Sequence, residues 1–224
     1  MRIFSVRGVP LVGWSSADPF NFRPRVPTLF WLSFGLFLFG TGEALLIAAG
    51  AGVSPWTVLA QGLGRSFGIG IGAATFLVSV AILLLWIPLR QRPGIGTVFN
   101  AFIIAATIEY LLPVLPAPAE GVGQLLQAAL GTLTVGLGSG IYLVANLGPG
   151  PRDGLMTGLQ RLTGYPIAGV RTCIEIAVIG AGWALGGTVG LGTVLFAFGI
   201  GPAVSVGLYL TALVSGAPVR PEKR

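Results

Sequence analysis

Two stretches decide the architecture of this 224-residue chain: SPWTVLAQGLGRSFG at residues 54–68 and GPRDGLMTGLQRLTG at residues 150–164. Shifted by 96 positions, they align without a gap and share proline, glycine, leucine and arginine positions. The match extends over positions 40–112, where 21 of 73 residues are identical to the residue 96 positions later. Many shared residues are glycine or proline, which set backbone geometry. The chain therefore contains two copies of one structural unit.

The composition around these stretches is that of a membrane protein. Only 9% of the residues are charged, 54% are hydrophobic, and the mean hydropathy is +0.87, whereas soluble domains have about 25% charged residues. Residues 69–89, 125–145 and 191–214 contain no Asp, Glu, Lys or Arg. Each of these runs is long enough as a helix to cross a hydrocarbon core of roughly 30 Å. The small-xxx-small spacing of Gly136 and Gly140 predicts close helix packing.

Each copy has the same order of elements: a long apolar span, a Gly/Pro break, a short segment and two further spans. The short segments, 56–67 and 152–163, cover about 18 Å as helices and are too short to cross a bilayer. They are predicted to be half-helices, either re-entrant or interfacial. The predicted full spans are residues 28–49, 69–89, 95–115, 125–145, 167–185 and 191–214.

Three full spans per copy is an odd number, so the second copy must have inverted topology. The predicted fold is an all-α polytopic membrane protein with two inverted repeats of three transmembrane helices. Each repeat has a short half-helix after its first span. The predicted segments are an N-terminal cytoplasmic tail, repeat 1, repeat 2 and a C-terminal cytoplasmic tail, at residues 1–26, 27–116, 117–216 and 217–224.

The distribution of basic residues supports this topology. With the N-terminus inside, 11 of the 13 basic residues lie on the cytoplasmic side, as the positive-inside rule requires, and Arg65 is the exception outside. The first 20 residues lack the apolar stretch and cleavage site of a secretory signal. We therefore expect a multi-pass protein of the bacterial cytoplasmic membrane with both termini in the cytoplasm.

Several functional classes are excluded by the residues that the chain lacks. It has no histidine and a single cysteine, Cys173, which excludes disulfide frameworks, zinc sites and His-based triads. No nucleophile–base pair or metal-ligand cluster is visible, so we expect neither an enzyme nor a bound cofactor. The basic residues that give the net charge of +6 lie at span ends. This position indicates that they interact with anionic lipid rather than with nucleic acid. The expected partners are the bilayer and an unknown small solute or ion, and a homo-oligomer is a further option.

Three glutamates lie inside predicted spans: Glu43, Glu109 and Glu175. Ionisable groups in a membrane are costly and are functional candidates by default. In the 96-residue register each glutamate has a serine as its partner. Lipid-facing positions would more naturally show an aliphatic residue in at least one copy. The pattern therefore indicates interior positions around a shared polar core.

Each glutamate also has a purely structural interpretation. Glu175 follows Arg171 by four residues, so an ion pair on one helix face is at least as good an explanation as transport. Glu43 and Glu109 have no cation within one turn. Each must find a partner on another helix, serve local helix packing, or hold a proton because desolvation disfavours its charge.

The short segments supply the remaining candidates. Asp153 lies near the first turn of the second half-helix, where it either caps free N–H groups or lines a midplane site at the broken helix. Arg65 and Arg161 match across the repeat near the far end of each half-helix. They are expected to interact with the helix dipole, with anion contact as the alternative. Asn100 and Asn146, near span ends, are weaker candidates.

Several strings resemble the YczE/YyaS/YitT family of bacterial integral membrane proteins, and the resemblance covers about residues 28–206. Thr57 stands where the family often has Asp after Pro-Trp, and Glu109 stands where Asp is common. The resemblance implies a multi-pass membrane protein and says little about activity. The strings are LGPGPRDGLMTGL (147–159), RTCIEI (171–176), GWALGGTVGLGT (182–193), SPWTVLAQGL (54–63) and RPGIGTVFNAF (92–102).

The leading functional hypothesis is a small secondary transporter or permease with a polar site near the axis that relates the repeats. A proton-coupled version would use Glu43 and Glu109 as carriers, with Asp153 shaping the site. The alternative is a non-transporting scaffold or regulator that binds a partner within the bilayer. A lipid-modifying membrane enzyme, supported only by Arg152 and Asp153, is a third option.

Overall fold

A computed structural model describes residues 9–118 and 120–216, and this part of the chain is helical, without strands. The short helices predicted at 56–67 and 152–163 are both present, one residue longer at their N-terminal ends. The elements in chain order are α1 (Val26–Ala49), α2 (Pro55–Phe67), α3 (Ile71–Trp86), α4 (Ile95–Leu111), η2 (Leu112–Val114, a 3₁₀ turn), α5 (Val122–Ala145), α6 (Pro151–Thr163), α7 (Ile167–Ala184) and α8 (Leu191–Val214).

Five of the described helices are long and apolar enough to cross a membrane: α1, α4 with its 3₁₀ extension, α5, α7 and α8. The pair α2 and α3, bent by 113° at the break between them, makes a sixth if it is counted as one broken span. The span predicted over 69–89 is shorter than expected, because α3 has 16 residues and ends at Trp86. Pro88, two residues on, lacks the N–H that a continuing helix needs. The all-helical, polytopic architecture predicted from the sequence is confirmed.

The same local geometry ends the first span and the short helix in both copies. Gly50 after α1 and Asn146 after α5 are both left-handed, with φ of 69° and 51°. Gly68 after α2 and Gly164 after α6 are left-handed as well, with φ of 65° and 73°. A residue in this conformation lets the chain reverse direction at a helix C-terminus. The helix breaks predicted from the sequence therefore have a common backbone cause.

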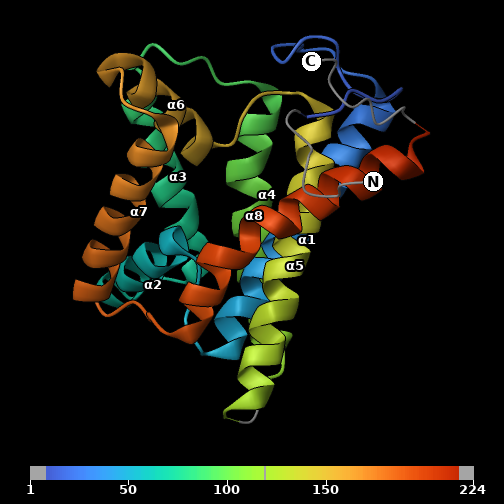
Figure 1. Cartoon of the computed structure of the whole chain (residues 1–224). Helices are drawn as coiled ribbons and strands as arrows, with labels where there is room; N and C mark the ends of the chain where they lie inside the picture. The colour runs from blue at the N-terminus through green and yellow to red at the C-terminus, as the bar shows by residue number, and fades with distance from the viewer. Residues whose placement is uncertain (1–8, 119, 217–224) are drawn as a thin grey trace.

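The helices pack in two groups. Helices α1, α4, α5 and α8 form the larger group, and α2, α3, α6 and α7 form the second, which joins the first mainly through α3 and α4. Figure 1 shows the second group on the left, with α6 at the upper end of this group and α2 at its lower end. The two half-helices therefore approach the middle of the structure from opposite ends.

Glycines allow α1 and α5 to cross in close contact. Gly35 lies against Gly138, and Gly42 lies against Gly131. Along the contact the residue numbers rise in α1 while they fall in α5, so the two helices are antiparallel. A shift of 96 residues converts each of these contacts into the other. The close packing predicted at Gly136 and Gly140 is also confirmed, because both glycines lie against the backbone of α8.

The loops that follow α1 and α5 also make a pair of hydrogen bonds that correspond under the 96-residue shift. The Gly96 amide donates to the carbonyl of Leu147 at 2.7 Å, and the Gly192 amide donates to the carbonyl of Ala51 at 2.8 Å. These two hydrogen bonds exchange under the same 96-residue shift. The packing of α3 along α4 has no such counterpart, because the corresponding helices α7 and α8 barely touch. The described structure is therefore symmetric at its centre and asymmetric at its edge.

Candidate functional site

The half-helices meet at Trp56 on α2 and Arg152 on α6. The Arg152 guanidinium carbon lies 5.6 Å from the centre of the Trp56 ring, in the geometry of a cation–π contact. The two residues are 96 positions apart and occupy the same place in their respective copies. The contact therefore brings the first turns of the two short helices together.

Glu43 of α1 is fully buried and lies at the N-terminus of α2. The Ser54 hydroxyl is 2.9 Å from both carboxylate oxygens, and the Thr57 hydroxyl donates to Oε2 at 2.8 Å. Ser54 is the residue that precedes α2, and Thr57 is in its first turn. The carboxylate is stabilised by these hydroxyls and by the positive end of the α2 dipole. The Glu43 carboxylate therefore has its hydrogen-bond partners on another segment, which is one of the alternatives that the sequence allowed.

Asp153 lies in the first turn of α6, where the sequence placed it. Its Oδ2 accepts a hydrogen bond from the Tyr142 hydroxyl of α5 at 3.1 Å, and it makes no capping hydrogen bond to the start of α6. Asp153 is exposed, whereas Thr57, its equivalent in the first copy, is completely buried. The two copies thus each place one carboxylate at a half-helix N-terminus, and only the second is accessible.

Arg152 links the two halves of this arrangement. It precedes Asp153 in the first turn of α6, and its guanidinium lies over the ring of Trp56, the neighbour of Thr57 in α2. Within the part of the chain that the structure describes, Arg152 forms no ion pair and no hydrogen bond through its guanidinium, and its contact is with the Trp56 ring. We call Glu43, Ser54, Thr57, Tyr142, Arg152 and Asp153 the central polar cluster.

Glu109 lies away from this cluster. It is exposed on α4, and its Oε2 accepts a hydrogen bond from the Ala73 amide in the first turn of α3 at 3.2 Å. A carboxylate at this place satisfies an N–H group that has no partner within α3. The geometry explains Glu109 by the packing of α3 on α4.

Arg171 and Glu175 form the ion pair that their spacing predicts, with 2.8 Å between Nε and Oε1. The side chains are 53% and 24% exposed on α7. The three glutamates therefore do not converge on one cavity. Glu43 is central, Glu175 lies on α7 in an ion pair, and Glu109 caps the N-terminus of α3.

The weaker candidates are placed at four different points. Asn100 lies beside Gly150 at the start of α6, close to the central polar cluster. Asn146 caps α5 and donates to the Ser16 carbonyl at 2.8 Å. Arg65 donates to the Gly186 carbonyl in the loop before α8, and Arg161 is exposed in the last turn of α6. Of these, only Asn100 is near the centre.

Sequence reasoning missed Trp56 and Tyr142 as site residues. Both are aromatic residues in apolar surroundings and look like packing residues. Only the repeat register carried a signal, because it pairs Trp56 with Arg152. Which equivalent residues touch cannot be read from a register, since it depends on how the copies pack.

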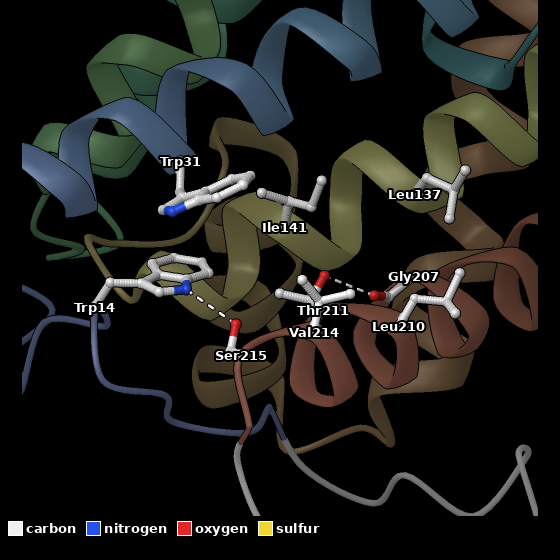
Figure 2. A pocket seen from close by; sticks show the side chains of 9 residues that line it. All are labelled: Trp14, Trp31, Leu137, Ile141, Gly207, Leu210, Thr211, Val214 and Ser215. Carbon is white, nitrogen blue, oxygen red and sulfur yellow. Dashed lines mark hydrogen bonds between the residues drawn. The ribbon is translucent and has the colours of Figure 1, made fainter.

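A pocket of about 170 Å³ lies elsewhere, between the N-terminal segment, α1, α5 and α8. Figure 2 shows Trp14 beside Trp31, with the Trp14 ring nitrogen hydrogen-bonded to Ser215 at 3.1 Å. The two rings stack with their centres 5.8 Å apart. The lining contains no charged side chain. The contacts are those of an N-terminal segment fastened to the ends of α1 and α8.

The fold and its apolar helices define the class of this chain: it is a multi-pass, all-helical membrane protein. It belongs to the family of unknown function DUF6198, whose family model matches residues 26–208. It is 38% identical over 213 residues to an uncharacterized protein of Haemophilus influenzae, covering 95% of this chain and 97% of that protein.

Two Bacillus subtilis proteins are also similar. The uncharacterized membrane protein YczE is 34% identical over 167 residues, covering 74% of this chain and 75% of YczE. The uncharacterized protein YyaS is 28% identical over 165 residues, covering 72% and 82%. The resemblance to this family seen in the sequence is thereby confirmed. No solved structure matches the chain.

Proposed function

We propose that this protein is a small secondary transporter or permease whose substrate site is the central polar cluster. Two inverted repeats of three spans and one half-helix would form the transport unit. The contact of Trp56 with Arg152 carries the proposal, because it joins the same position of the two sequence repeats, as an axis between inverted copies would require. Repeat transporters bind their substrates at such a point, between broken helices.

The reciprocal contacts support the inverted arrangement. The antiparallel crossing of α1 and α5, which exchanges with itself under the 96-residue shift, is what an axis in the membrane plane produces. With both termini in the cytoplasm, the same axis places the two half-helices on opposite sides of the bilayer. The distribution of basic residues favours this orientation.

We further propose that Glu43 and Asp153 are the coupling carboxylates. Both carboxylates lie at half-helix N-termini, beside the contact of Trp56 with Arg152. One is buried and one is exposed, so a proton or ion could be exchanged with only one of them in this conformation. The position of Glu109 does not support the carrier role that the sequence suggested for it, because its carboxylate serves the α3 terminus.

Flux into proteoliposomes tests the transport function. The full chain is reconstituted, and uptake of a broad panel of solutes is measured with and without a pH gradient. We expect uptake above empty vesicles, with Glu43→Gln and Asp153→Asn each reducing it at least tenfold. Glu109→Gln is the matched control, since it neutralises an equally intramembrane carboxylate away from the cluster, and should retain uptake.

Absence of any flux across the panel would show that the transport function is wrong. If uptake is found but survives both cluster variants, the site has been misplaced. The second candidate function is a membrane scaffold, favoured by α7, in which only Gly182 is buried. It requires that a specific membrane protein co-purifies with the chain, and that substitutions on the outer face of α7 abolish the association while cluster variants do not.

A further inference from the structure

An apolar cavity of about 490 Å³ lies between α2, α3, α6 and α7. Every residue that lines it is apolar or aromatic. Its size is typical of sites for small organic molecules, which lie in the range of about 300–1,000 Å³. No side chain of the central polar cluster belongs to its lining.

The cavity lining follows the 96-residue register in part. Every lining residue from the second half of the chain lies 96 positions after a lining residue of the first half, and the first half contributes the remaining lining residues alone. A cavity placed by chance between four helices would not have this pairing. The pairs include Leu59 with Leu155, Val78 with Ile174 and Ala81 with Ala177.

Trp56 joins the cavity to the polar cluster. Its side chain is part of the cavity lining, and the Arg152 guanidinium lies over its ring. On α6, Leu155 lines the cavity one turn after Arg152. An apolar chamber and a cation therefore adjoin, separated by one indole.

The charges at this junction indicate which headgroup would bind. The Glu43 carboxylate is already bonded to two hydroxyls, and Asp153 accepts from Tyr142. The Arg152 guanidinium has donors in a planar fork and, among the described residues, no acceptor. It also lies in the first turn of α6, where the helix dipole favours an anion.

We propose that this cavity binds an organic oxyanion with an apolar tail, such as a medium-chain carboxylate. The tail would occupy the chamber between α3 and α7, and the carboxylate would form a bidentate pair with Arg152. Trp56 turns away from the guanidinium when the headgroup arrives. The inference deepens the proposed transport function, because it names the chemical class of the substrate.

Bromine quenching of tryptophan fluorescence tests the binding directly. The full chain is placed in lipid nanodiscs and titrated with 2-bromoundecanoate, whose bromine lies next to the carboxylate and therefore beside Trp56 in the proposed pose. We expect saturable quenching that is lost in Trp56→Phe and is reversed by undecanoate. In a series of carboxylate competitors, each added methylene should lower the aqueous inhibition constant about fourfold, until the chamber is full.

Variants separate the two parts of the site. Arg152→Gln should weaken binding at least tenfold, and Arg152→Lys should recover part of it. Arg161→Gln is the control on the same helix, since Arg161 is exposed in its last turn. Ala81→Phe should fill the chamber and abolish saturable quenching, while Ala168→Phe, on the exposed start of α7 outside the lining, should not.

Two results would overturn the inference. One is quenching that is the same in Trp56→Phe as in the unaltered chain. The other is equal competition by an undecyl trimethylammonium ion, which would show that Arg152 does not select the headgroup. The proposed transport function can fail separately from this inference. Carboxylate binding without any flux would support the binding site and contradict transport. Flux of another solute without carboxylate binding would support transport and contradict this substrate class.

Discussion

Removal of the Glu43 side chain should destabilise the protein far more than removal of the other intramembrane glutamates. Glu43→Ala leaves the buried Thr57 hydroxyl without its acceptor, whereas the Ser54 hydroxyl can still donate to the Thr57 hydroxyl oxygen, 2.9 Å away. An unsatisfied buried polar group costs about 1–3 kcal/mol. One such group gives an expected loss of about 1–3 kcal/mol of unfolding free energy, before any contribution from the cavity left behind.

Three comparisons isolate the cause. Glu43→Gln keeps one acceptor oxygen and should cost clearly less than Glu43→Ala. The combined variant Glu43→Leu, Ser54→Ala and Thr57→Val removes donors and acceptor together, and should recover at least half of the loss, because no polar group is left unpaired. Glu175→Ala, which breaks only a partly exposed ion pair, should cost less than about 1 kcal/mol.

The assay is reversible unfolding in mixed micelles as the fraction of denaturing detergent is raised, followed by circular dichroism. The midpoint and slope give the free energy of unfolding for each variant. If Glu43→Ala costs no more than Glu175→Ala, the carboxylate does not organise the start of α2. If the triple variant is as unstable as Glu43→Ala, the unpaired hydroxyl is not the cause.

Two further substitutions test packing and charge. In Gly138→Ala the new Cβ would lie 2.5 Å from the carbonyl oxygen of Gly35, so α1 and α5 must separate, and we expect a loss of about 1–3 kcal/mol in the same unfolding assay. Gly180→Ala, with nothing within 4 Å, should be neutral or stabilising by up to about 1 kcal/mol. A double-mutant cycle on Arg171 and Glu175 should give a coupling below about 1 kcal/mol; a larger value would show that the pair is shielded in the membrane.

The sequence predicted where the helices break more accurately than where the glutamates lie. Helix ends depend on local residues, such as the glycines at the ends of α2 and α6. The depth of a glutamate depends on which neighbouring helix covers it. Glu43 and Glu109 have similar sequence surroundings and serine partners, yet one is fully buried and the other is exposed at a helix terminus.

The sequence by itself determined that this is a helical membrane protein and that a short helix follows the first and the fourth predicted spans. These properties follow from composition and from the 96-residue register, which act through local backbone geometry. Only the tertiary structure decided which equivalent residues meet. Trp56 touches Arg152, and the apolar cavity is lined by α2, α3, α6 and α7 together, because these helices pack on one another in the folded chain.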